Sequence, residues 1–281
     1  MKKKLLITMG CSYTEGNGCY GDFKTPSDFV LKPTSELFSA EELKLLPNQF
    51  HTNGWPLRLT KKIGYDRLIN LGTAGSSTSG QLKRYFELYY DETFEDYDVT
   101  IIWLMTQPTR LSFYKNGKVA DLLTHFSDES LSENVKLPEL PAAYVKFIQD
   151  IDIDPILEQI FYIKCMEQYC ENKNYNLLIA HTEFHSDILL KYYHTSKYYL
   201  SLKPTTVFSV LDDNDYAFCL HPNESGYEKI SKFILSEIQL NHPKLLPHTP
   251  SKNVEWEWKG NSFQWPQPNE TIRKKLKTKK I

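Results

Sequence analysis

The segment ITMGCSYTEG, residues 7–16, places a serine at a turn where it could do chemistry. A short apolar run precedes Gly10, Cys11 and Ser12, and Gly16 follows closely. This order is typical of a buried strand that turns into a helix. A serine at such a turn is either a helix cap or a nucleophile. As a nucleophile it needs a base to take its proton, and histidine is the usual base.

Two further segments contain candidate partners for this serine. His221, in HPNESGYEKIS, stands just before a helical pattern near the other end of the chain and is the candidate base. Gly75, in NLGTAGSS, follows a second apolar run. The backbone amides of Ser12 and Gly75 are candidate donors to the oxyanion of a tetrahedral intermediate. The alternatives are structural: His221 in an ordinary helix entry capped by Asn223, and Gly75 as a turn glycine.

The bulk composition narrows the classes of protein. The chain has 281 residues, 41% of them hydrophobic, which suffices for one large domain. A formal net charge of −2 does not favour nucleic acid as a partner. Three lysines follow Met1, but the apolar run after them is too short for a signal peptide. No apolar stretch reaches the roughly 20 residues that a membrane span needs. The five cysteines have no pattern, so we expect reduced thiols and a cytoplasmic location, with association with a virion left open.

Short apolar segments alternate with helical patterns along the chain. Strands are expected at residues 4–9, 67–70, 99–105 and 176–180. Helices are expected after Ser79, from Pro155 with Asp154 as its cap, and over residues 223–238. This alternation predicts an α/β protein, a three-layer α/β/α sandwich around a mostly parallel sheet.

Three stretches fit that plan poorly. Residues 17–58 and 110–150 are long and rich in turn and polar residues, and we expect them to be insertions over one edge of the sheet. The domain is therefore expected to span residues 1–245. Residues 246–281 form a Trp- and Pro-rich extension with a basic end, in which the tryptophans are expected to pack on the domain or on another subunit. A homo-oligomer or an assembly contact through this tail stays open.

The three blocks around Ser12, Gly75 and His221 resemble the SGNH (GDSL-like) hydrolase superfamily, which comprises serine esterases and lipases on a flavodoxin-like sheet. GCSYTEG lies where that family has its nucleophile block, NLGTAGSS has its Asn-x-x-x-x-Gly spacing, and HPNESGYEKIS matches its histidine block. The resemblance covers about residues 4–240 in order and spacing, apart from the two insertions. It implies Ser12 as nucleophile, His221 as base, and the Ser12 and Gly75 amides as oxyanion donors.

The chain departs from the family pattern at three positions. Gln107 stands where the family has an oxyanion asparagine, and its longer amide could still donate unless it only satisfies a loop. Phe218 stands where the family has the aspartate that orients the histidine. Asp215 and Asp213, with Asp212 beside them, are candidate replacements, and a backbone carbonyl is the other option. Cys11 replaces the aspartate of Gly-Asp-Ser.

These residues lead to the expectation of a serine esterase that needs neither metal nor cofactor. Its substrate would be a small-molecule or carbohydrate ester, such as an O-acyl group on a sugar. The alternative is a catalytically inactive fold of the same type used for binding or assembly, for example in a phage virion. The segment HTEFH, residues 181–185, has a spacing that suggests metal ligands, but the preceding apolar run predicts a strand end and not a helix.

Overall fold

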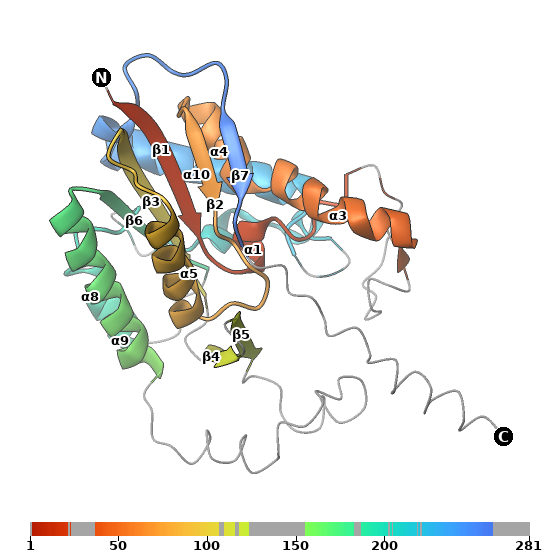
Figure 1. Ribbon diagram of the computed structural model, residues 1–281, viewed down its shortest axis with the longest axis horizontal. Coiled ribbons are helices and arrows are strands. Elements are labelled where there is room, and N and C mark those ends of the chain that lie inside the picture. The colour runs from red at the N-terminus through yellow and green to blue at the C-terminus, as the bar shows by residue number, and fades with distance from the viewer. Residues whose placement is uncertain are drawn as a thin grey trace, which may run out of the picture.

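A parallel five-stranded sheet with helices on both faces organises the computed structural model of the chain (Figure 1). The α/β class and the parallel sheet expected from the sequence are thereby confirmed. The described residues are 2–21, 23, 37–106, 110–115, 118–123, 155–182, 187–201, 203, 205–217, 219 and 221–260.

The strand order in the sheet is β6-β3-β1-β2-β7. All neighbouring pairs are parallel, with β1 at the centre. The strands are β1 (Lys3–Met9), β2 (Arg67–Asn70), β3 (Tyr97–Met105), β6 (Asn176–His181) and β7 (Glu255–Trp258). Residues 5–9 of β1 are all buried, because helices cover both faces of the strand.

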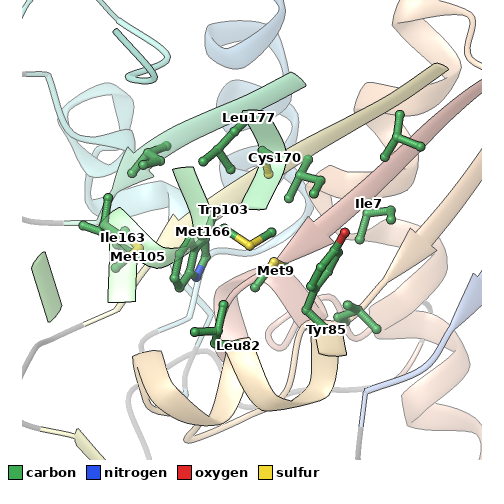
Figure 2. Packing of buried hydrophobic residues seen from close by; sticks show 14 of the residues in the cluster. Ile7, Met9, Leu82, Tyr85, Trp103, Met105, Ile163, Met166, Cys170 and Leu177 are labelled. Atoms are coloured by element: carbon green, nitrogen blue, oxygen red, sulfur yellow. The ribbon is translucent and has the colours of Figure 1, made fainter. Parts of the chain in front are cut away.

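Three helices cover the first face of the sheet: α5 (Thr78–Asp91), α8 (Pro155–Lys173) and α9 (Asp187–Tyr193). Alternate residues of β1, such as Ile7 and Met9, point to this face and pack with Tyr85 of α5 and Met166 of α8 (Figure 2). The side-chain hydroxyl of Ser77 caps α5 by accepting the Gly80 amide at 3.0 Å.

The opposite face is covered by α4 (Trp55–Ile63) and α10 (Glu224–Asn241). Leu6 of β1 lies on this side with Leu57 of α4 and Ile230 of α10. Asn223 caps α10, its side chain accepting the Gly226 amide at 3.1 Å. Two helical layers therefore enclose the sheet.

The stretches expected to be loop-rich contain regular structure. The first holds α3 (Ala40–Asn53), which starts with a capping box between Ser39 and Glu42, and the beginning of α4. The second holds an antiparallel hairpin of β4 (Arg110–Lys115) and β5 (Lys118–Leu123). The extension supplies β7, which pairs with β2.

The carboxyl ends of β1, β2 and β3 meet at one edge of the sheet because the three strands are parallel. From β1 the chain crosses to β2 on one side and then to β3 on the other, so the direction of winding reverses at β1. Open α/β sheets bind ligands beyond such a reversal point. The turn that carries Ser12 directly follows β1 and lies at this position.

Candidate active site

Ser12 is the first residue of α1 (Ser12–Glu15), a single helical turn after β1. Cys11 is the residue that caps this turn, and its carbonyl accepts the amides of Thr14 at 2.9 Å and Glu15 at 3.0 Å. The Cys11 side chain makes no capping hydrogen bond. The Ser12 hydroxyl is therefore not the cap of this helical turn.

The hydroxyl of Ser12 meets the ring of His221. The Nε2 atom of His221 lies 2.8 Å from the Ser12 Oγ atom, and the serine is 6% exposed. On the other side of the ring, Nδ1 lies 3.1 Å from the backbone carbonyl oxygen of Cys219. A carbonyl can only accept, so Nδ1 donates a proton to it and Nε2 is left to accept from the serine.

A tight turn before α10 presents His221 to the serine. The amide of Ala217 donates to the His221 carbonyl at 2.8 Å, and the amide of Asn223 donates to the Asp215 carbonyl at 2.8 Å. Across from this turn lies Gly18, whose φ is +102°. A Cβ atom on Gly18 would stand 2.9 Å from the Cβ of His221, so glycine lets the two segments approach each other.

Aromatic side chains form one wall beside the serine and histidine. The Tyr13 ring lies 5.1 Å from the His221 ring and 4.8 Å, edge to face, from the Phe208 ring. Tyr13 follows Ser12 directly in the chain. The Tyr13 ring thus packs between the rings of His221 and Phe208.

Gly75 lies half-buried in the loop after β2 with φ at +75°. Apart from its two chain neighbours, no described heavy atom lies within 4 Å of a Cβ added at this position. Glycine is therefore favoured here by the positive φ and not by a lack of space. The loop is tied to the serine turn because the Gly10 carbonyl accepts from the Thr73 amide at 3.2 Å and from the Ser76 hydroxyl at 3.0 Å. Within the described chain, the amides of Ser12 and Gly75 donate no hydrogen bond.

The remaining sequence candidates fall elsewhere. Gln107 and Phe218 lie outside the described residues. Asp213 is exposed. Asp215 is buried, and its carboxylate accepts from Lys229 at 2.6 Å, from Ser225 at 2.9 Å and from the Asp212 amide at 2.9 Å. The structure thus gives Asp215 other partners and places a backbone carbonyl against the histidine ring.

Glu15 and His51 are buried polar residues near the site that sequence reasoning did not single out. Glu15 lies in the same helical turn as Ser12 and is 8% exposed, and the Nε2 atom of His51 stands 3.9 Å from its Oε1 atom. Glu15 was visible in the GCSYTEG segment, whereas nothing in the sequence links it to His51 on α3.

His181 is buried at the end of β6, where its Nε2 atom lies 3.1 Å from the Tyr199 hydroxyl. His185, the other histidine of HTEFH, is not among the described residues. In the described parts of the chain, no three His, Cys, Asp or Glu side chains are grouped to hold a metal ion. No described helix is both long enough and apolar enough to cross a bilayer.

A groove of about 990 Å³ opens at the amino-terminal side of the sheet. Its lining includes Lys2, Asp98 and Lys244 but neither Ser12 nor His221. The candidate active site is therefore separate from this groove.

No protein-family model matches the sequence, and searches of curated proteins and of solved structures return no match either.

Proposed function

We propose that this protein is a serine esterase in which Ser12 is the nucleophile and His221 the base. The observation that carries the proposal is the distance of 2.8 Å between the Ser12 Oγ atom and the Nε2 atom of His221. These residues are 209 positions apart in the chain. Their meeting at the carboxyl edge of the sheet provides a paired nucleophile and base where α/β proteins bind ligands.

The reaction would follow the steps of acyl transfer to serine. The Ser12 oxygen attacks the ester carbonyl while Nε2 of His221 takes the hydroxyl proton. Negative charge develops on the carbonyl oxygen, and the Ser12 and Gly75 amides are the candidate donors to it. His221 then returns the proton to the leaving alcohol. Water, activated by the same ring, releases the acyl group from Ser12.

The Cys219 carbonyl takes the place that a carboxylate has in a triad. It holds the proton on Nδ1, which keeps Nε2 in the accepting form. A neutral carbonyl stabilises the imidazolium that forms during attack less than a carboxylate does. We therefore expect slower turnover than in a triad enzyme of similar architecture.

We further propose that the chain is a divergent SGNH hydrolase. Four of the five strands, β2-β1-β3-β6, have the chain order 2-1-3-4 of flavodoxin-like sheets, which supports this assignment, whereas the fifth strand, β7, lies beside β2 and departs from that order. The serine, glycine and histidine blocks lie after β1, after β2 and before α10, in the family's order. The substrate would be a small ester or an O-acyl group on a carbohydrate, with Gln107 as a further candidate oxyanion donor.

A fluorophosphonate probe tests the proposal because it labels only a serine that a base activates. We expect labelling of the wild-type protein, no labelling of Ser12→Ala, and a fall of at least about 10³-fold in the hydrolysis of a nitrophenyl ester by Ser12→Ala. Cys11→Ala is the matched control at the neighbouring position and should keep its label, which excludes the thiol as the labelled group.

The second candidate is an inactive fold of the same type that binds or assembles. The carbonyl in place of a carboxylate against His221 is the observation that favours it. Failure of the probe to modify the wild-type protein, under conditions that label a known esterase, would favour this second candidate.

A further inference from the structure

We infer that Glu15 is a positioning residue that aims the Gly75 amide at the oxyanion. The inference rests on the proposed function, because it assigns a role within that reaction. Glu15 stands three residues after Ser12, in the same helical turn. Its role would be to hold the glycine loop at a fixed place relative to the nucleophile.

The contact that carries this inference joins the two loops of the site. The Oε2 atom of Glu15 accepts the amide of Ala74 at 2.7 Å. Ala74 is the residue before Gly75, so this bond restrains the backbone from which the Gly75 amide projects. Gly75 has no side chain, and an added Cβ would meet no described heavy atom within 4 Å beyond its chain neighbours. The loop must therefore be held through the neighbours of Gly75.

The same loop is held at a second point by the C-terminal strand. The Nε1 atom of Trp258, in β7, donates to the Gly72 carbonyl at 2.8 Å. The Trp258 ring also stacks on the His51 ring, with centroids 4.3 Å apart and planes 18° apart. His51 in turn faces the second carboxylate oxygen of Glu15. Glu15 thus connects the turn that carries Ser12 to the glycine loop directly and to β7 through the rings of His51 and Trp258.

The burial of Glu15 and His51 is costly and so calls for an explanation. Both residues are buried, His51 being 7% and Glu15 8% exposed, and the Nε2 atom of His51 has no hydrogen-bond partner in the described chain. Removing a carboxylate and an imidazole from water costs free energy that an apolar pair would not. A role in fixing the backbone beside the oxyanion donor explains why a carboxylate stands here.

Substitutions at Glu15 separate positioning from simple stabilisation. In Glu15→Gln the amide oxygen can still accept the Ala74 amide, so we expect most of kcat to remain. In Glu15→Ala that acceptor is lost, and we expect kcat to fall about 10- to 100-fold while KM stays within about twofold. The upper end approaches the loss caused by removing one oxyanion donor outright, about 10²–10³-fold.

Glu167 provides the matched control. It is buried in α8, on the other side of the molecule from α3, and its carboxylate accepts from Tyr192 at 2.6 Å and Ser196 at 2.8 Å. Glu167→Ala should lower the unfolding midpoint and leave kcat unchanged. Equal losses of kcat in Glu15→Ala and Glu167→Ala would overturn the inference, because general loosening would then account for both.

Hydrogen exchange of the Ala74 amide tests whether Glu15 holds the glycine loop without measuring esterase activity. We expect the Ala74 amide to exchange slowly with solvent in the wild-type protein and in Glu15→Gln, and faster in Glu15→Ala, as measured by nuclear magnetic resonance. Faster exchange with unchanged kcat overturns the positioning role and leaves the esterase proposal standing. A wild-type protein that neither hydrolyses esters nor reacts with the fluorophosphonate probe overturns the esterase proposal, and the positioning role with it.

Discussion

At the scale of single residues, the buried Asp215 carboxylate has hydrogen-bond partners of its own in Lys229 and Ser225. Burial alone would raise the pKa of the Asp215 carboxyl, but hydrogen bonds from Lys229 and from two further donors outweigh burial and hold its pKa below the ordinary value. Lys229 also pairs with Asp212 at 2.7 Å. Asp215 is therefore expected to contribute to stability and not to acyl transfer.

Asp215→Asn should lower stability at neutral pH and reduce the loss of stability in acid. A carboxyl whose pKa is lower in the folded than in the unfolded chain stabilises the fold at pH values above its unfolded pKa of about 3.9. That contribution is lost as the pH falls through the lower pKa of the folded state. Urea unfolding between pH 3 and pH 7 measures the effect, with the exposed Asp213→Asn as control. A loss of kcat/KM near the roughly 10⁴-fold seen when a triad aspartate is replaced would contradict our view of Asp215.

The sequence predicts Ser12 and His221 because their blocks carry recognisable neighbours, such as Gly10 and Pro222. It does not predict the Cys219 carbonyl, since every residue has one and only the turn geometry selects it. It also does not predict that Glu15 accepts from Ala74. That bond joins side chain to backbone across two loops, and no residue type marks the backbone partner.

At the scale of elements, the position of His221 depends on how the segment after α1 packs against the turn before α10. Gly18 touches that turn, and the Tyr227 hydroxyl of α10 donates to the Asn17 carbonyl at 2.8 Å. Tyr227 is fully buried. The segment after Ser12 therefore packs against the turn and the helix that hold His221 in place.

Gly18→Ala should move His221 away from Ser12. Its Cβ would stand 2.4 Å from the Pro222 carbonyl oxygen, in a backbone conformation that alanine disfavours. We expect a loss of about 1–3 kcal/mol in the free energy of unfolding and at least a tenfold fall in kcat. Gly21→Ala is the control, because Gly21 also has a positive φ but faces the movable end of Gln49. Equal kinetic losses in both variants would contradict this reasoning.

The apolar strands were predictable from the sequence, even the four-residue β2, whereas α3 and β7 were not. Strands β1, β2, β3 and β6 begin and end within two residues of the sequence expectation. Helix α3 begins with a capping box but contains Pro47, and a proline inside a helical pattern normally argues against a helix. Strand β7, with the sequence EWEW, has four residues among prolines and turns. Its pairing with β2 is a tertiary effect that local sequence does not encode.

At the scale of the whole molecule, the C-terminal extension contributes part of the central sheet. Strand β7 pairs along the whole of β2, from Arg67 opposite Glu255 to Asn70 opposite Trp258. Arg67 also forms ion pairs with Glu92, which directly follows α5, and with Glu257 of β7. The extension thus shields the side of β2 that would otherwise be a free edge.

Truncation after residue 245 should destabilise the protein and promote self-association. The loss of β7 exposes the backbone donors and acceptors of β2 and removes Trp258 from Gly72. Truncation after Gly260 keeps every contact described for β7 and is the control. Thermal unfolding and size-exclusion chromatography compare the two forms. Identical unfolding midpoints would mean that β7 does not belong to the cooperative unit.

The hydrogen bond from the His221 ring to the main chain of Cys219 has an evolutionary consequence. A side-chain acid can be deleted by one codon change, whereas a main-chain oxygen survives every replacement at its own position. The tautomer of the His221 ring therefore does not depend on the residue type at position 219, provided that the turn keeps its shape. Position 218 therefore need not supply an acid to orient this ring, and the sequence has a phenylalanine there.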